Sequence, residues 1–132
     1  MPFHVVRSGQ ETAAGVEIKL GAEHTDGAVS VLELVLAPGG GAPSHRHSRE
    51  HEILVVSEGA LRVEEEDGHT VLNAGDLVLI PRGTRHAFAN AADGVMRALI
   101  VTVPGGLEEF FRALEAGVDA GQAAERAGLE FG

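Results

Sequence analysis

Turn signals divide this chain into short segments, and their spacing constrains the fold more than any other feature. Glycine, proline, asparagine and aspartate recur at intervals of about 8 to 12 residues, between short runs rich in valine, leucine and isoleucine. The run at 15–20 alternates apolar and charged residues, and the long run at 29–37 contains one charge, Glu33. Regular short strands joined by tight turns are typical of a closed or double-sheet β fold, with about eight to ten strands here.

The remaining segments complete this interpretation. Further strands are predicted at 52–57, 60–66, 69–72, 77–80, 86–89 and 96–103. Asp67-Gly68 is a two-residue hairpin signal. Residues 1–15 form an irregular arm in which 3–6 is a candidate short strand. After Pro104, a helix is predicted because apolar residues recur at i, i+3, i+4 and i+7; these are Leu107, Phe110, Phe111 and Leu114. A second short helix is predicted at 120–127.

The stretch from Gly39 to Gly59 brings metal-ligating side chains together. His45 and His47 are two residues apart, so on a strand their rings point to the same face. Glu52 begins the next apolar run, and the intervening residues 48–50 are polar and turn-like. Glu52 can therefore fold back beside the two rings. Two imidazoles and a carboxylate suit a divalent metal of intermediate softness.

A fourth ligand requires the second stretch, from Gly75 to Asn90. Residues 76–80 form a predicted strand, 81–83 turn the chain, and His86 opens the next strand. The spacing within the two stretches resembles both signature motifs of the cupin superfamily, over roughly residues 29–104. The matching positions are Gly39, His45, His47, Glu52 and Gly59 in the first motif, and Gly75, Pro81, Gly83, His86 and Asn90 in the second.

This resemblance implies an all-β double-stranded β-helix, also called a jelly-roll or cupin barrel, with a short C-terminal helix. It implies that His45, His47, Glu52 and His86 bind one divalent transition metal per chain. Iron, manganese, nickel, copper, cobalt and zinc all suit this set of ligands, so the ion stays open. The sequence after Pro104 resembles a quercetin-dioxygenase-like branch of small single-domain cupins.

Spacing and the alternation of side chains along a strand predict which residues near the candidate ligands face the interior. His51 adjoins Glu52, but only one of them can face the interior, and the distance to Gly59 selects Glu52. Arg46 and Arg85 alternate with ligands and should point away from the site; the alternative is that they guard its rim and attract an anionic substrate. Parity with Glu52 and His86 predicts a pocket lined by Leu54, Val56, Leu79 and Phe88.

Length and composition limit the organisation and the function. The 132 residues fit a single domain: an arm and first strand at 1–28, the barrel at 29–104 and a helical tail at 105–132. The formal net charge of −10 disfavours nucleic-acid binding, and no apolar run reaches the length of a membrane span. The start of the chain lacks an apolar signal region, so we expect the cytoplasm. There is no cysteine to act as a ligand.

The primary functional hypothesis is a metal-dependent enzyme, a dioxygenase-like oxidoreductase acting on a small organic molecule, with Glu52 as a possible catalytic base. Two alternatives stay open: a non-redox metal enzyme (isomerase, cyclase, decarboxylase or hydrolase), or a module that binds or senses a small molecule without turnover. A homodimer is expected, with residues 3–6 pairing between subunits.

Overall fold

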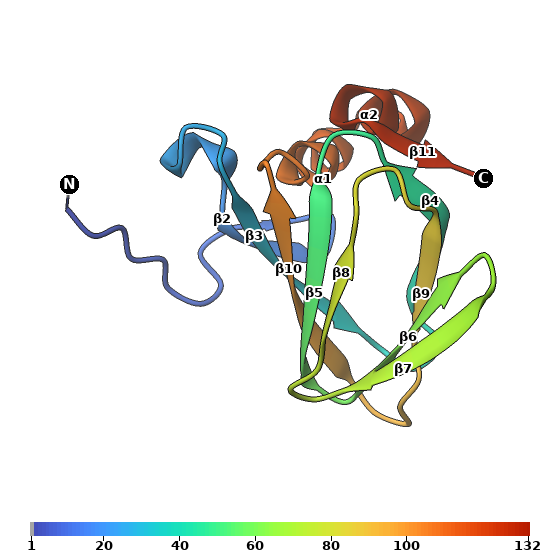
Figure 1. The fold of residues 1–132 in the computed structure, drawn as a ribbon. Helices are drawn as coiled ribbons and strands as arrows, with labels where there is room; N and C mark the ends of the chain where they lie inside the picture. Colours follow the sequence, from blue (N-terminus) through green and yellow to red (C-terminus); the bar gives the residue numbers. More distant parts are fainter. Residues whose placement is uncertain (1) are drawn as a thin grey trace.

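The computed structural model describes residues 2–132, in which two antiparallel sheets face each other (Figure 1). The first sheet has, in spatial order, β1 (Thr12–Ala13), β2 (Val16–Leu20), β3 (Ser30–Leu36), β10 (Met96–Val103), β5 (His51–Glu58) and β8 (Leu77–Ile80). The second has β11 (Leu129–Phe131), β4 (Gly41–His47), β9 (His86–Asn90), β6 (Ala60–Glu65) and β7 (Gly68–Asn73).

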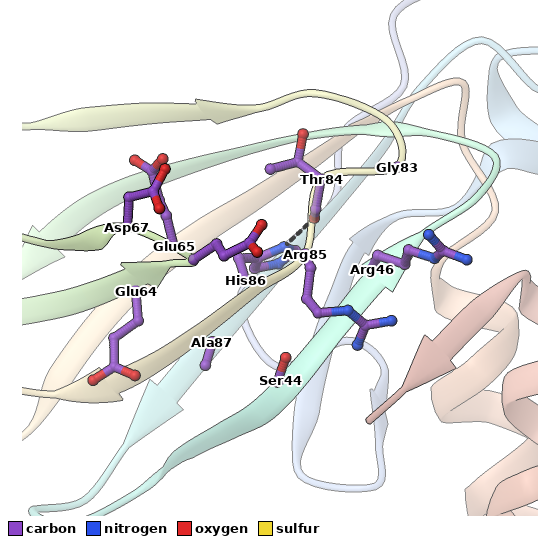
Figure 2. Close-up of a pocket in the computed structure, with 11 residues that line it drawn as sticks. Ser44, Arg46, Glu64, Glu65, Asp67, Gly83, Thr84, Arg85, His86 and Ala87 are labelled. Atoms are coloured by element: carbon purple, nitrogen blue, oxygen red, sulfur yellow. Dashed lines mark hydrogen bonds between the residues drawn. The ribbon is translucent and has the colours of Figure 1, made fainter.

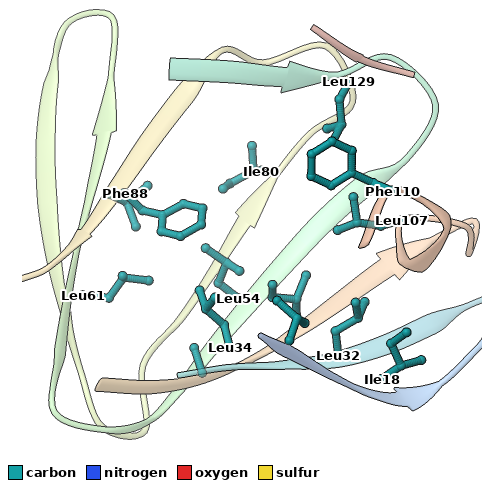
Figure 3. Close-up of a cluster of buried hydrophobic side chains, with 14 of the residues drawn as sticks. Ile18, Leu32, Leu34, Leu54, Leu61, Ile80, Phe88, Leu107, Phe110 and Leu129 are labelled. Carbon is teal, nitrogen blue, oxygen red and sulfur yellow. The ribbon is translucent and has the colours of Figure 1, made fainter. Parts of the chain in front are cut away.

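The chain passes repeatedly from one sheet to the other between β3 and β10. Only β6 and β7 are consecutive neighbours in the same sheet along that path, where they form a hairpin. This connectivity is consistent with the double-stranded β-helix, so the predicted fold class is confirmed. Apolar side chains on alternate residues fill the space between the sheets (Figure 3), and Leu32, Leu54 and Leu61 are fully buried there.

Two turns show how neighbouring strands are connected. Gly59 joins β5 to β6 with φ of 78°, and a Cβ there would lie 2.7 Å from the carbonyl oxygen of Val95, so a larger residue would be both strained and crowded. At the β6–β7 hairpin Glu65 pairs with Gly68, so the two turning residues are Glu66 and Asp67. The predicted turn at Asp67-Gly68 was therefore one residue too late.

The N-terminal arm differs from the sequence prediction. Residues 3–6 are not a strand, and Phe3 is 98% exposed. The first paired segment is instead the short β1, which forms a hairpin with β2. No strand among the described residues pairs with this segment, so its β propensity is not realised.

The C-terminal segment lies over one end of the barrel (Figure 1). Helix α1 (Glu108–Glu115) begins at the predicted apolar stripe, and α2 (Ala120–Ala127) has the predicted bounds. Asp119 caps α2 by accepting a hydrogen bond from the Gln122 amide, and Gly128 ends it in the left-handed conformation. Gly128 then turns the chain into β11, a strand that the sequence did not indicate.

Glu108, in the first turn of α1, is completely buried rather than solvated. Its carboxylate accepts hydrogen bonds from the amides of Ala22, at 2.6 Å, and Gly106, at 3.2 Å. Ala22 opens the short 3-10 helix η1 (Ala22–His24), so Glu108 joins the C-terminal helix to the loop between β2 and β3. Among the helices of residues 2–132, none is long and apolar enough to cross a bilayer.

Candidate metal centre

Four ionisable side chains meet between the two sheets. His45 and His47 come from β4, His86 from the adjacent β9, and Glu52 from β5 in the opposite sheet. One possible ligand atom from each lies within 4.8 Å of the others. All four side chains are buried, with 5% or less of each residue exposed. His45 pairs with His86 in register, which places the first and second sequence motifs side by side.

Each histidine ring is oriented by a hydrogen-bond acceptor at Nδ1. The acceptors are the backbone carbonyls of Pro43, 2.7 Å from His45, and Thr84, 2.9 Å from His86. For His47 the acceptor is the carboxylate of Glu50, at 2.9 Å. Because a carbonyl or an ionised carboxylate only accepts, each Nδ1 carries the proton and donates it. The lone pair of each ring is therefore on Nε2, as metal ligation requires.

The inner atoms of the cluster lack hydrogen-bond partners. His47 Nε2, His86 Nε2 and Glu52 Oε1 are all buried without one. Glu52 lies 3.4 Å from His47 Nε2 and 3.2 Å from His86 Nε2, but in a neutral ring this nitrogen has a lone pair and cannot donate to the carboxylate. Each buried unsatisfied polar atom costs about 1–3 kcal/mol. A divalent cation would satisfy all three atoms, so these residues fit a metal.

The local electrostatics favour a neutral ring beside a charged carboxylate. Burial lowers the pKa of His45, and the neighbouring rings of His86 and His47 lower it further, so its lone pair stays available. Burial alone would raise the pKa of Glu52, but a hydrogen bond from His86 and the positive charge that the three imidazoles carry when protonated outweigh it and hold that pKa below its ordinary value. Glu52 is therefore an anion in the absence of any metal.

The pKa of His47 moves in the opposite direction. Burial alone would lower it, but the hydrogen bond from Nδ1 to Glu50 and the charges of Glu52 and Glu50 raise it above the ordinary value. Glu50 is 2% exposed and was missed by sequence reasoning, which placed it in a polar turn without a role at the site. A carboxylate three residues after a metal-ligating histidine, just before a strand, is the signal that could have indicated it.

The other histidines lie outside the cluster. His51 faces the opposite side of β5, where its Nδ1 accepts a hydrogen bond from the Arg82 amide at 2.9 Å. The structure thus places Glu52, and not His51, among the four. His4 and His24 stack on each other with ring centroids 4.0 Å apart, and His69 is exposed on β7.

A cavity of about 240 Å³ adjoins the cluster and is almost entirely apolar. Three of the four candidate ligands line it: His45, His47 and Glu52. Its other lining residues, all apolar, are Leu34, Leu36, Gly41, Ala42, Pro43, Phe88, Ile100, Leu107, Phe110, Phe111, Leu129 and Phe131. Four of the five phenylalanines of the chain are in this set.

The predicted pocket lining needs correction. Phe88 lines the cavity, but Leu54 and Val56 are sealed in the core behind it, with 0% and 1% exposed. Leu79 is 56% exposed and faces away. Glu52 pairs with Ile80, so Ile80 is the residue of β8 that shares the interior face. The error lay in the register between β5 and β8, which strand parity within one segment cannot supply.

A second and more polar groove, of about 680 Å³, is lined by the β6–β7 hairpin and by residues near the start of β9 (Figure 2). Carboxylates of Glu64, Glu65 and Asp67 lie on one side of it and Arg46 and Arg85 on the other. Both arginines point away from the cluster and contact the C-terminal segment. Arg46 forms an ion pair with Glu130, and Arg85 donates to the carbonyl of Gly132.

Comparison with known proteins gives one family match. The sequence model of the family described as "Cupin domain" matches residues 32–102. A curated relative, germin-like protein subfamily 1 member 7 of Arabidopsis thaliana, is 40% identical over 70 residues. That alignment covers 47% of this chain but 31% of the relative, so the chain spans about a third of that protein's length.

Solved structures share the architecture. KdgF from Halomonas sp. aligns with a TM-score of 0.67 at 20% identity, covering 80% of this chain and 96% of that chain. A predicted oxalate decarboxylase from Thermotoga maritima gives a TM-score of 0.67 at 24% identity, covering 76% of this chain and 99% of that one. At these identities the likeness establishes the fold alone.

Proposed function

The chain belongs to the cupin family, and we propose that it is a metal-dependent, dioxygenase-like oxidoreductase that acts on a small organic molecule. One observation carries the proposal: three unsatisfied buried ligand atoms belong to a cluster that forms one end of an apolar cavity. Atoms left without partners inside a core are costly unless a bound group satisfies them. The cavity provides room for a substrate beside that group.

The three histidines would hold the metal through Nε2, and Glu52 through its carboxylate. A bound transition metal would supply a Lewis acid and, if redox-active, an electron-transfer centre for dioxygen. His45, His47 and His86 are held by their Nδ1 hydrogen bonds, so the rings keep their orientation when substrate enters.

Glu52 is the only carboxylate on the lining of the cavity within the described residues. It is held as an anion, so it can accept a proton from a substrate hydroxyl that approaches it. The surrounding leucine, isoleucine and phenylalanine side chains give the substrate an apolar environment. An apolar cavity also favours entry of dioxygen, which supports the oxidoreductase of the quercetin-dioxygenase-like branch over other chemistry.

A non-redox enzyme is the second candidate, because a base beside a Lewis acid is also what an isomerase or decarboxylase requires. The structural neighbours do not decide the matter, since one is described as a predicted oxalate decarboxylase and another as a DMSP lyase. The choice rests on whether dioxygen is consumed.

The test is oxygen uptake with defined metals. Protein purified without added metal is analysed for metal content, loaded with Fe²⁺, Mn²⁺, Ni²⁺, Cu²⁺, Co²⁺ or Zn²⁺, and supplied with a panel of small enols and diols. The proposal expects substrate-dependent oxygen uptake with a redox-active ion, abolished by Glu52→Gln. Product without oxygen uptake would support the second candidate, and binding without product would indicate a module that lacks turnover.

A homodimer is part of the proposal. The arm extends away from the barrel (Figure 1), with Phe3 98% and Val5 59% exposed. Such apolar side chains are protected when a second copy covers them. Light scattering at micromolar concentration should give the mass of a dimer, and Phe3→Asp should shift it toward the monomer; a monomeric wild type would refute the dimer.

A further inference from the structure

We propose that the C-terminal segment 107–131 is the specificity-determining wall of the cavity, and that it selects a substrate whose body is a single apolar ring or a group of similar size. The inference deepens the proposed function, on which it rests. Three observations carry it: the position of the segment beside the ligands, its attachment to the barrel, and the lack of polar groups on the wall.

Strand β11 continues the sheet beside the histidine strand. Leu129 pairs with His47 and Phe131 with His45, so the inward residues of β11 lie next to the two ligands of β4. Leu129 is 7% exposed and Phe131 is 49% exposed, and both line the cavity. The intervening residue, Glu130, points the other way.

Helix α1 extends this wall with Phe110. The ring of Phe131 lies with its centroid 5.7 Å from that of His45 and 6.1 Å from that of Phe110. Phe110 in turn contacts Phe111 edge-on, with centroids 5.2 Å apart. A continuous aromatic surface therefore runs from a candidate ligand to the helix, at distances where rings interact favourably.

Specific contacts hold the segment in place. On the outside, Arg46 pairs with Glu130, and Arg49 donates to the carbonyl of Arg126 at 2.6 Å. The Ser48 hydroxyl donates to the carbonyl of Gly128 at 2.9 Å. These attachments use the arginines near the motifs to anchor the wall, and none of those arginines reaches the cavity lining. An anionic substrate would therefore find no cation there apart from a bound metal.

The wall lies outside the part of the chain that the family shares. The cupin-domain match covers 32–102 and includes all four candidate ligands, whereas the wall residues begin at Leu107. The shared barrel thus provides the metal centre, and this segment shapes what may approach it. Because the wall lacks hydrogen-bonding side chains, a polyhydroxylated or dicarboxylic substrate would leave its polar groups unpaired and would bind more weakly.

The volume of the cavity limits the part of the substrate that lies inside it. An apolar cavity of about 150 Å³ accommodates benzene. The volume here, about 240 Å³, suits one ring with a small alkyl substituent and an oxygen donor directed at His45, His47 and Glu52.

Binding of a graded probe series tests the wall without requiring turnover. Zn²⁺-loaded protein is titrated calorimetrically with catechol, 4-methylcatechol, 4-tert-butylcatechol and oxalate; metal-free protein is titrated with toluene and propylbenzene. Wild type should prefer the alkylated catechols to catechol and to oxalate. Phe131→Ala should weaken the binding of 4-tert-butylcatechol about tenfold relative to that of catechol, a typical value for lost apolar contacts in a pocket. Phe131→Trp should exclude the bulky probe while catechol still binds.

The matched control is Leu79→Ala, which removes an exposed apolar side chain outside the cavity and should change none of these affinities. Metal content and circular dichroism are measured for each variant. Equal weakening of every probe in Phe131→Ala, or unchanged selectivity in both Phe131 variants, would overturn the proposal, as would failure of wild type to bind any of the alkylated probes. Binding of alkylbenzenes but not catechols would instead refute the proposed metal chemistry while supporting the wall.

Discussion

The Nδ1 of His47 lies 2.9 Å from the Glu50 carboxylate, and both side chains are almost completely buried. This contact fixes the ring of one candidate ligand by a side chain rather than by the backbone. Glu50→Ala should weaken metal binding about 10- to 100-fold, the typical effect of removing the hydrogen-bond partner of a ligating histidine. Competition with a chromophoric chelator measures it.

Glu50→Gln provides the matched control, because an amide oxygen can still accept the proton of Nδ1. The Glu50→Gln variant should bind metal almost as tightly as wild type, unlike Glu50→Ala. If the alanine variant binds metal as tightly as wild type, Glu50 does not orient His47.

Leu79 and Ile80 are adjacent on β8 but differ in burial, so substitutions at the two positions test the register of this strand. Ile80 is 5% exposed and Leu79 is 56% exposed. Ile80→Ala should lower the free energy of unfolding by about 2–5 kcal/mol, the usual range for a buried isoleucine. Leu79→Ala, as the control, should change it by less than about 0.5 kcal/mol. Urea denaturation compares them; a larger loss at Leu79 would mean that β8 is displaced by one residue.

The sequence was sufficient to predict elements that depend on local pattern. The bounds of β10 and α2, and the convergence of His45, His47, Glu52 and His86, follow from alternation, helical spacing and motif spacing. Features that depend on pairing between distant segments were not predictable in this way. Strand β11 has only three residues and forms because it pairs with the edge of β4. Leu79 was wrongly predicted to line the pocket because its orientation depends on the pairing of Glu52 with Ile80.

The buried Glu108 should contribute to stability through the amide of Ala22. Glu108→Ala leaves this partly buried amide without its side-chain acceptor, whereas the Gly106 amide still donates to the Ser30 hydroxyl, so the free energy of unfolding should fall by about 1–3 kcal/mol. Its neighbour Glu109, with a largely exposed side chain, is the control, and Glu109→Ala should cost far less. Equal urea midpoints for the two variants would contradict this role.

Acidification should release the metal. The raised pKa of His47 means that, in the folded metal-free protein, its imidazole stays protonated up to a higher pH than a free histidine would. Metal must displace that proton, so affinity should fall as the pH falls through the raised pKa. In the metal-free protein, the same shift contributes stability that is present below the ordinary histidine pKa and lost as the pH rises through the raised one.

Calorimetry in buffers of different ionisation enthalpy at pH 6 and pH 8 measures the protons released on Zn²⁺ binding. More protons should be released at pH 6 than at pH 8. Identical affinity and proton release at both values would mean that no histidine titrates on binding.

The central claim is that His45, His47, Glu52 and His86 hold one divalent ion per chain. The most direct test is the metal content of purified His86→Ala and His51→Ala, measured by mass spectrometry after equilibration with Zn²⁺ and removal of the excess. Wild type and His51→Ala should each retain one ion per chain, since His51 faces away from the cluster. His86→Ala should retain little, because it removes the ligand from β9. One ion per chain in His86→Ala, or loss of the ion in His51→Ala alone, would contradict the account.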